Sequence, residues 1–386
     1  MEYKNLLDVS IINDKTVDEF EGFKKYVATG DIQDNKIINY DEVTYDSKPS
    51  RANREVEIGD ILVAKMKETV KVLKITEENY DKYIFSTGFC TLKSKNERLD
   101  SDYFYKILIS EYFQEQKDKY SKGATQKAIN NSGLNKIKIP VPPMDVQKQI
   151  VEVLDKAQNL INNRKAQIKL LEDLIESIFY NMFGDPVMNQ MKWTTYNVED
   201  VCEKIVGGGT PSKSKPEYYV GKIPWVTPKD MKVLNIVDSQ DHINDLAIQN
   251  SSTKLIPSGS LLMVIRSGIL KRYLPLALNS VDVTINQDMK AFLIDSKKIN
   301  KYFFLHFWML AQRFILSKVR AVTADNIEFK QIKEMQIIMP PINLQNEFAE
   351  KVEAIESQKQ LLEDSLKLLK NNYNGLMQRA FKGELF

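Results

Sequence analysis

The segment at residues 206–231, VGGGTPSKSKPEYYVGKIPWVTPKDM, combines chemical groups that contacts with nucleic acid use. Three glycines allow a close backbone approach, while hydroxyl and lysine side chains reach phosphates and bases. An ATP-binding loop does not fit, because GxxxxGK[ST] requires a glycine directly before Lys213. A DNA-contacting loop and a solvated loop without a ligand remain open. The candidate DNA-binding residues are Gly209, Thr210, Ser212, Lys213, Lys215, Tyr218 and Lys229.

Four shorter basic clusters carry similar side chains. Arginine reads guanine, asparagine and glutamine read adenine, and lysine neutralises phosphates. A single cluster of this kind is usually a solvated surface, but their recurrence at corresponding places in two halves of the chain favours DNA contact. The candidates are Arg51, Asn53, Arg54, Lys65, Lys67, Lys122, Thr125, Gln126 and Lys127 in the first half, and Arg266, Ser267, Lys271, Arg272 and Thr323 in the second.

Signatures of catalysis are missing from the sequence. It holds neither the NPP[YF] motif, nor a glycine-rich S-adenosylmethionine loop after a strand, nor a helicase motif. The two histidines, His242 and His306, leave few candidates for metal or Ser-His-Asp chemistry. A nuclease built on scattered carboxylates has too weak a pattern to be recognised. We therefore expect a binding protein, without a metal site, rather than a catalyst.

Composition favours a cytoplasmic protein of more than one domain. A chain of 386 residues is too long for one ordinary core, and two distant cysteines suit a reducing compartment. No apolar run reaches the roughly 18–20 residues that span a bilayer, and the first ten residues lack a signal-peptide pattern. The net charge of +2 leaves nucleic-acid binding open, because the distribution of charge decides it.

The elements that would position these clusters occur twice. The proline pairs that end at Pro143 and Pro341 lie 198 residues apart, and GLNKIKIPVPPMDVQKQIVEVL at 133–154 then matches IKEMQIIMPPINLQNEFAEKV at 332–352. The repeat extends backward more weakly, since VEIGDILVAK resembles LIPSGSLLMVIR at an offset near 200. The pattern predicts two copies of a mixed domain, each followed by a helix.

Each proline pair marks a passage from strand to helix. Proline restricts the residue before it to an extended conformation, and Asp145 and Asn343 stand where an N-cap acceptor is expected. Neither glycine nor proline occurs from Met144 until Gly184. The two prolines therefore predict a fixed angle between each domain and a long helix.

Both predicted helices show the spacing of a coiled-coil seam, with apolar residues every three or four positions. In the first helix we place Leu160 in the seam and expect the stretch NNRKAQ at 162–167 to interrupt it. The central seam residues are Ile150, Ala157, Ile168, Leu171, Ile175, Ile178, Phe348, Ile355, Leu362, Leu366, Leu369 and Leu376.

The predicted fold class is α+β, with two mixed α/β domains, two long helices and an internal pseudo-twofold repeat. Because the second domain must fit between the helices, we expect them to pack as an antiparallel coiled coil. One further helix is predicted in each domain, at 101–120 and 301–319. The predicted boundaries are 1–143 and 186–341 for the domains, and 144–185 and 342–386 for the helices.

This order of motifs resembles the specificity subunit of type I restriction-modification systems. The resemblance rests on PVPP with Gln147, GATQKAI, GGGTPSK, IPWVTPKDM and IMPP with Gln345, and covers essentially the whole chain. It implies two target recognition domains, each reading one half of a split, asymmetric site in double-stranded DNA. It also implies that the helices set the gap between the half-sites and dock two methylation subunits, which in turn bind restriction subunits.

The same resemblance implies that the chain is non-catalytic and binds no cofactor or membrane, since S-adenosylmethionine, ATP and Mg²⁺ belong to the partners. Two departures stand out. AVTADNI replaces GATQKAI in the second copy, so base reading by Gln126 does not transfer to Ala324, and the first domain lacks GGGTPS and IPW. A coiled-coil adaptor that does not bind DNA, and an enzyme with an unrecognised site, remain alternatives.

Overall fold

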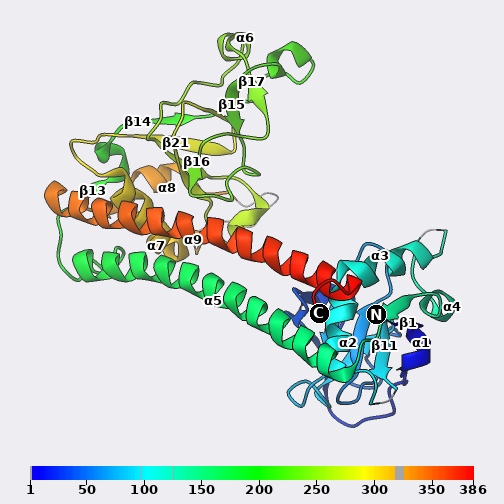
Figure 1. Ribbon diagram of the computed structural model, residues 1–386. Coiled ribbons are helices and arrows are strands. Elements are labelled where there is room, and N and C mark those ends of the chain that lie inside the picture. Colours follow the sequence, from blue (N-terminus) through cyan, green and yellow to red (C-terminus); the bar gives the residue numbers. More distant parts are fainter. Residues whose placement is uncertain (1, 96, 125, 318–325) are drawn as a thin grey trace. The chain divides into compact units, whose positions relative to one another are not determined.

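Both predicted long helices are present in the computed structural model, which describes residues 2–95, 97–124, 126–317 and 326–386. Helix α5 spans Met144–Phe183 and helix α9 spans Ile342–Lys382 (Figure 1). The chain divides within these helices, into one unit of residues 1–165 and 364–386 and another of residues 166–363. Each unit therefore contains one α/β domain and half of each helix, and we describe each unit by itself.

The two helices are antiparallel in both units. In the first unit, Ile150 and Leu154 of α5 share a hydrophobic core with Met377 and Phe381, near the C-terminal end of α9. In the second unit, the C-terminal half of α5 packs on the N-terminal half of α9. Its core includes three phenylalanine rings with centroids 5.0–5.5 Å apart, those of Phe179, Phe183 and Phe348.

All twelve central residues of the predicted seam are buried or half-buried. The expected interruption was wrong. Leu160 is 56% exposed, whereas Ile161 is 4% exposed and lies in the core of the first unit. Ile161 follows Ala157 by four residues and precedes Arg164 by three, so the heptad spacing continues without a gap. Leu160 is as hydrophobic as Ile161 but lies outside the heptad position that Ile161 occupies.

The position in α9 that is equivalent to Ile161 is occupied by Lys359. Its ammonium lies 2.9 Å from a Glu172 carboxylate oxygen in the same unit. Burial acts to lower the pKa of Lys359, but the hydrogen bond to Glu172 and the nearby charge of Glu356 outweigh burial and raise it. An ion pair with one exposed partner, since the Glu172 side chain is 47% exposed, thus replaces an apolar contact at this point of the second seam.

The proline junctions are fixed by two buried glutamines rather than by the predicted N-caps. Helices α5 and α9 begin directly after the proline pairs, so Asp145 and Asn343 lie within the first turns. Gln147 donates to the carbonyls of Arg98 and Pro142, both at 2.8 Å, and accepts from the amide of Asp100 at 2.8 Å.

Gln345 repeats these contacts in the second unit. It donates to the carbonyl of Pro340 at 2.8 Å and accepts from the amide of Asn300 at 2.9 Å. Asp100 and Asn300 are themselves the N-cap residues of α2 and α7. Each glutamine therefore joins a domain helix, a proline pair and a long helix at one buried point.

Each domain is built from the same three sheets. In the first domain, the first sheet pairs β1 (Tyr3–Asn5) with β12 (Lys138–Pro140). The second sheet has the spatial order β2 (Ser10–Ile12), β11 (Phe89–Ser94), β8 (Ile61–Ala64) and β9 (Val72–Lys74). The third sheet has the order β6 (Asp41–Val43), β3 (Lys24–Val27), β10 (Tyr83–Ser86) and β7 (Ala52–Arg54). Among the described strands of the first domain, only β3 and β10 pair in parallel. The short strands β4 (Ile32–Gln33) and β5 (Lys36–Ile37) form a separate ladder.

The second domain repeats most of this topology: its second sheet has β16 as an added strand, parallel to β19, and its third sheet has no described counterpart of β7. Its sheets are β13 (Thr195–Asn197) with β22 (Gln336–Ile338); β14 (Cys202–Gly207), β21 (Met289–Ile294), β18 (Leu261–Val264), β19 (Leu276–Asn279) and β16 (Asn235–Ile236); and β17 (His242–Ile243), β15 (Ile223–Val226) and β20 (Thr284–Ile285). Strands β15 and β20 are again parallel. The repeat seen in the sequence therefore covers the whole domain, and IPWV in β15 has its topological counterpart in KKYV of β3.

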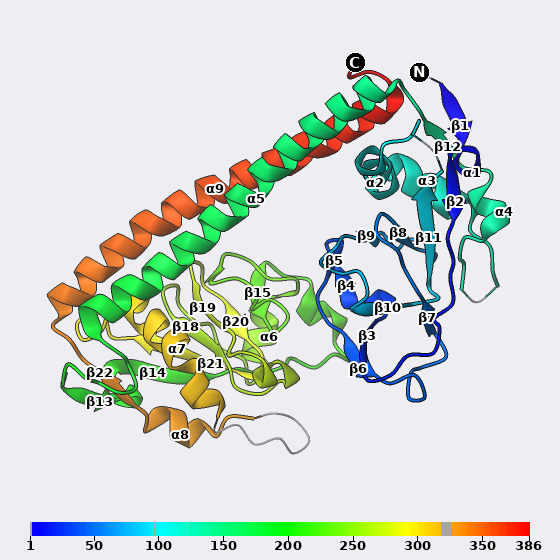
Figure 2. The ribbon, with the colours of Figure 1, turned by 90° about the horizontal axis from the view of Figure 1, so that it is seen from below.

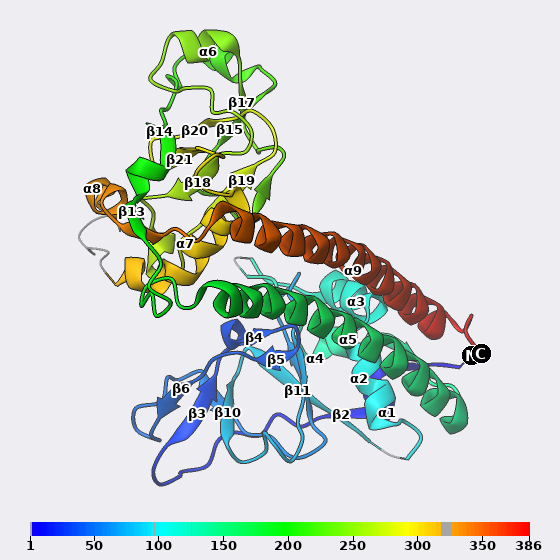
Figure 3. The ribbon, with the colours of Figure 1, turned by 90° about the vertical axis from the view of Figure 1, so that its left-hand side faces the viewer.

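The sheet that contains β8 in the first domain and the sheet that contains β18 in the second are each buried on both faces. In β18, Leu261 and Met263 face α7 and the long helices, while Leu262 and Val264 face the three-stranded sheet. Figures 2 and 3 show the same layers in both units: the sheet that contains the parallel pair lies on the side away from α2 or α7. The long helices thus cover one face and leave the loops at the strand ends free.

The helices within the domains differ in part from the prediction. The segment predicted as one helix at 101–120 forms α2 (Ser101–Ile109) and α3 (Glu111–Tyr120), because Ser110 is extended and its hydroxyl accepts from the amide of Phe113. Helix α7 spans Lys301–Leu316, and the predicted end at 319 lies outside the described residues. The remaining helices are α1 (Leu6–Val9), α4 (Asn131–Leu134), α6 (Asp245–Gln249) and α8 (Phe329–Lys333). None of the helices in the described ranges is long and apolar enough to cross a membrane.

The seam assignment predicts unequal losses of stability at two adjacent residues. Ile161→Ala removes buried methyl groups from the core and should lower the free energy of unfolding by about 2–4 kcal/mol. Leu160→Ala changes an exposed side chain and should cost less than about 0.5 kcal/mol. Urea unfolding followed by circular dichroism measures both, and equal losses would show that the seam runs through Leu160 instead.

Candidate nucleic-acid interface

Backbone hydrogen bonds gather the candidate residues of the first domain at one end of the sheet that contains β8 and β11. The amide of Lys65 donates to the carbonyl of Gly88, and the amide of Lys67 donates to the carbonyl of Lys127, both at 2.9 Å. The amide of Thr87 donates to the carbonyl of Arg51 at 2.9 Å. We call these segments, residues 51–53, 65–69, 86–88, 122–124 and 126–129, the first loop cluster.

The segment after α3 closes on itself within this cluster. Lys122 and Ala128 exchange two backbone hydrogen bonds of 3.0 Å. Gly123 has φ +142°, and a Cβ there would lie 2.1 Å from the carbonyl oxygen of Gln126, so only glycine fits. The narrow turn leaves Lys122, Gln126 and Lys127 exposed together.

Not every candidate of the first domain faces solvent. Arg51 is exposed, while Asn53, Lys65 and Lys67 are half-buried. Arg54 is only 7% exposed, and its guanidinium lies 3.1 Å from the carboxylate of Asp14. This geometry makes Arg54 a packing residue that joins two segments, and leaves Arg51 as the exposed arginine of the KPSRANRE stretch.

The three glycines of the second domain serve close packing. A Cβ on Gly208 would lie 2.0 Å from the carbonyl oxygen of Asn286, and one on Gly209 would lie 2.4 Å from the hydroxyl of Ser252. The indole of Trp225 donates to the carbonyl of Gly209 at 3.1 Å. The glycine segment is therefore held against the body of the domain, and the groups it offers to a ligand come from the residues that follow.

Residues 286–288, NQD, organise the second domain's candidates and were missed by the sequence interpretation. The side chain of Gln287 hydrogen-bonds that of Thr210. Asp288 lies 2.5 Å and 2.6 Å from two guanidinium nitrogens of Arg266. Consecutive residues thus bring Thr210 and Arg266 together. The repeat offset of 200 could have indicated these residues, because it aligns NQD with STG at 86–88. Residues 86–88 join β10 to β11, and NQD joins the equivalent strands β20 and β21.

We call residues 208–215, 265–267, 286–288 and 326–327 the second loop cluster. It shares two backbone hydrogen bonds with the first. The amide of Ile265 donates to the carbonyl of Asp288 at 2.8 Å, as the amide of Lys65 does to that of Gly88. The amide of Ile327 donates to the carbonyl of Ile265 at 2.9 Å, as the amide of Ile129 does to that of Lys65. The guanidinium of Arg266 remains about half exposed despite its ion pair. The two clusters therefore share a scaffold but present different side chains.

The other candidates of the second domain have varied surroundings. Lys213 is exposed, and the hydroxyls of Ser212 and Ser214 lie 2.8 Å apart. Tyr218 is buried, and Lys215 donates to its hydroxyl at 3.1 Å, a hydrogen bond that raises the pKa of Lys215. Lys229 pairs with Asp241 at 2.7 Å. Ser267 caps a short helical turn, and Lys271 and Arg272 are exposed at the end of that turn. Thr125 and Thr323 lie outside the described residues.

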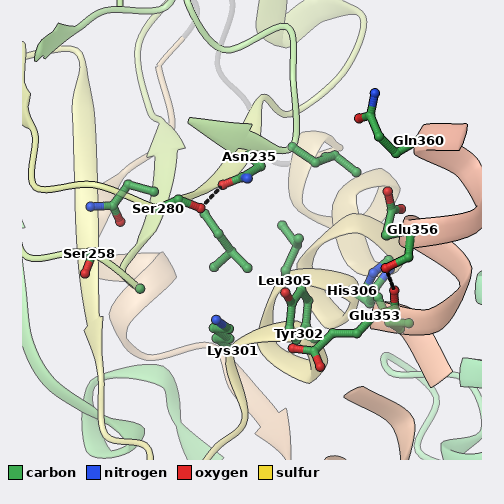
Figure 4. Close-up of a pocket in the computed structure, with 16 residues that line it drawn as sticks. Asn235, Ser258, Ser280, Lys301, Tyr302, Leu305, His306, Glu353, Glu356 and Gln360 are labelled. Carbon is green, nitrogen blue, oxygen red and sulfur yellow. Dashed lines mark hydrogen bonds between the residues drawn. The ribbon is translucent and has the colours of Figure 1, made fainter. Parts of the chain in front are cut away.

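A cavity of about 860 Å³ lies elsewhere in the second unit (Figure 4). Its walls come from α7, α9 and the β16–β19 edge, and include Tyr302, Glu353 and Glu356. His306 faces it, but its ring packs edge-on against Phe348 at 5.5 Å. In the described ranges, no group of three or more histidine, cysteine, aspartate or glutamate residues is placed to hold a metal ion. This cavity belongs to the contact between domain and helices rather than to the loop cluster.

The duplicated domains, their matching loop clusters and the antiparallel helices define a two-domain α+β repeat protein. A family model described as the type I restriction modification DNA specificity domain matches residues 2–170 and 190–371. The chain belongs to this family. The match covers both domains and most of both long helices.

Individual relatives agree with this assignment. The EcoR124I/EcoR124II specificity subunit of Escherichia coli is 34% identical over 236 residues, which are 58% of this chain and 56% of that protein. The chain thus matches little more than half of that relative's length. The MjaIX specificity subunit of Methanocaldococcus jannaschii is 26% identical over 74% of this chain and 69% of its own length.

Two solved structures share the fold. One is a chain from work on complex assembly and conformational transition of the type I R-M system, with a TM-score of 0.63, 20% identity and coverage of 100% of this chain and 98% of that chain. The other is the type I restriction-modification system S subunit from M. genitalium, with a TM-score of 0.54, 13% identity and coverage of 98% and 96%. At these identities the likeness establishes the architecture alone.

The two arginines of the first domain should respond differently to substitution. Arg54→Met leaves Asp14 without its partner and should lower the free energy of unfolding by about 2–3 kcal/mol. Arg51→Met should leave stability within about 0.5 kcal/mol but weaken binding to duplex DNA. Urea unfolding and fluorescence anisotropy separate the two effects, and unchanged DNA affinity of the Arg51 variant would remove Arg51 from the interface.

Because His306 is buried, we expect the protein to lose stability in acid. Burial, with a smaller contribution from the charge of Lys359, lowers its pKa from the usual 6.5 to about 4. Between these values the unfolded chain binds a proton that the folded chain excludes, so stability should fall by up to about 3 kcal/mol as pH drops from 6.5 to 4. His306→Phe should show a shallower fall in urea unfolding at the same pH values. Equal pH dependence of the two proteins would contradict this assignment.

Proposed function

We propose that this chain is the specificity subunit of a type I restriction-modification complex and that each α/β domain reads one half of a bipartite DNA target. The observation that carries the proposal is the duplication itself. Two domains of one topology present loop clusters at equivalent strand ends, and each is joined to the long helices by the same buried glutamine. A protein that recognises two different DNA half-sites needs two domains of the same fold with different surface residues.

The loop clusters contain the groups that DNA recognition uses. Exposed lysines such as Lys122, Lys127 and Lys213 neutralise phosphates. Arg51, Gln126 and Arg266 offer the donors and acceptors that distinguish base edges. The residues differ between the clusters, so the two half-sites differ and the complete target is asymmetric.

The helices set the distance between the half-sites. Each helix spans the boundary between the two units, and the heptad spacing of its sequence continues across that boundary. Because an α-helix rises about 1.5 Å per residue, the number of residues between the two glutamine junctions determines the spacer length in the DNA.

The chemistry belongs to partner subunits in this proposal. Two methylation subunits dock on the repeated helix surfaces, one for each half of the pseudo-twofold repeat, and restriction subunits join through them. S-adenosylmethionine, ATP and Mg²⁺ bind to those partners, and this chain is a non-catalytic subunit. The complex acts in the cytoplasm, where its two buried cysteines remain reduced.

A matched insertion tests the helix spacing. Adding seven residues after Lys165 and seven after Glu363 lengthens both helices by about 10 Å and preserves the heptad register. Since one base pair occupies about 3.4 Å, the preferred spacer of the assembled methylation complex should grow by about three base pairs. Binding to duplexes with spacers of graded length measures this shift.

Insertion into α5 alone is the control, because it breaks the seam register and should abolish spacer-specific binding. An unchanged preferred spacer in the double-insertion variant would refute spacing by the helices. Failure of the unmodified complex to bind any duplex would instead favour a coiled-coil adaptor without a DNA role.

A further inference from the structure

A fully buried lysine lies beneath the first loop cluster. The side chain of Lys117, near the end of α3, has 0% exposure. Its ammonium donates to the carbonyls of Met66 at 2.8 Å and Thr69 at 3.0 Å, and lies 3.0 Å from a carboxylate oxygen of Asp118. An ammonium has three protons to donate, and these three partners satisfy them.

Asp118 completes the arrangement. Both of its carboxylate oxygens accept from the amide of Glu68 at 3.1 Å. Glu68 has φ +59°, a left-handed conformation that residues other than glycine rarely adopt. The pair therefore holds both carbonyls and the strained amide of the turn at residues 66–69, which follows β8 and carries Lys67.

The same helix end anchors the second segment of the cluster. The hydroxyl of Ser121 donates to the carbonyl of Lys117 at 2.8 Å, and the chain continues directly into Lys122. Met66 pairs with Ala128 across the two segments. A polar cleft beside this point is lined by Lys67, Glu115, Asp118, Lys119, Ser121 and Lys127. The buried pair thus lies directly below side chains that face the proposed DNA surface.

Among the described residues of the second domain, the loop cluster is joined by a different pair. An offset of 200 places Ser317 opposite Lys117, and an offset of 198 places Ile315 there, so neither equivalent is a cation. There the Arg266–Asp288 pair joins the corresponding segments at the surface. Because burying a charge is costly unless all its partners are present, the fully buried ammonium of Lys117 indicates a constraint on the loop cluster of the first domain.

We propose that Lys117 and Asp118 are positioning residues for sequence reading by the first domain. They hold the 66–69 turn in register with the segment that contains Lys122, Gln126 and Lys127, so that these side chains meet the bases and phosphates of one half-site together. Loss of the pair relaxes discrimination at that half-site and leaves the other unchanged. This inference rests on the proposed function in DNA recognition.

The test uses the complex assembled with its methylation subunits and a duplex that carries the motif found by methylation sequencing of the host. Discrimination is the ratio of affinities for this duplex and for duplexes with one base changed in either half-site. Lys117→Met should lower discrimination at least tenfold at the half-site that Arg51→Met also affects. Discrimination at the half-site affected by Arg266→Ala should stay within twofold.

Lys106→Met is the matched control. Lys106 is also a buried lysine of the first domain, and it pairs with Asp155 at 2.6 Å on the long helix, away from the loop cluster. Its loss should reduce thermal stability without changing either ratio. If Lys117→Met fails to fold, Asp118→Asn removes the counter-charge while keeping an acceptor for Glu68, and should lower the same ratio.

Unchanged discrimination in the folded Lys117 or Asp118 variants, or an equal loss at both half-sites, would overturn the positioning role. A comparable loss of discrimination in the Lys106 variant would also overturn it, because the effect would then follow stability. A wild-type complex that binds no duplex would refute the proposed function itself and is distinguishable from these results.

Discussion

The architecture depends on one buried hydrogen-bonding junction that occurs twice. Gln147 and Gln345 each join the start of a domain helix, a proline pair and a long helix, with distances that agree within about 0.1 Å. Both amides are fully buried, so breaking these bonds would leave polar groups unsatisfied in the interior. The domain therefore has little freedom to tilt on its helix. In a protein proposed to read two half-sites, this rigidity converts helix length into DNA spacing.

The junction separates what the two copies share from what they vary. Sheets, proline pairs and heptad seams repeat closely because they must preserve the same geometry in both units. The loop clusters retain the backbone links and change the side chains: Lys65 and Gly88 in the first domain correspond to Ile265 and Asp288 in the second. Specificity can thus diverge at the strand ends without disturbing the scaffold.

Much of the fold could be predicted because it follows from the spacing of apolar residues along the sequence. The long helices, the seam and the repeat follow from spacing and from two proline pairs. Features that depend on tertiary partners could not be predicted. The break at Ser110, the burial of Arg54 by Asp14 and the role of residues 286–288 all require knowledge of which distant segments meet. The displacement of Leu160 by Ile161 could have been found by counting heptads strictly. The individual roles of the candidate DNA-binding residues stay predictions.

Methylation sequencing of the host genome, with and without the gene for this chain, tests the central claim most directly. The account predicts one methylated motif that depends on the gene and consists of two different short half-sites separated by a fixed number of unspecified base pairs. A continuous motif, a palindromic motif or a gap of variable length would contradict two different readers held at a distance set by the helices.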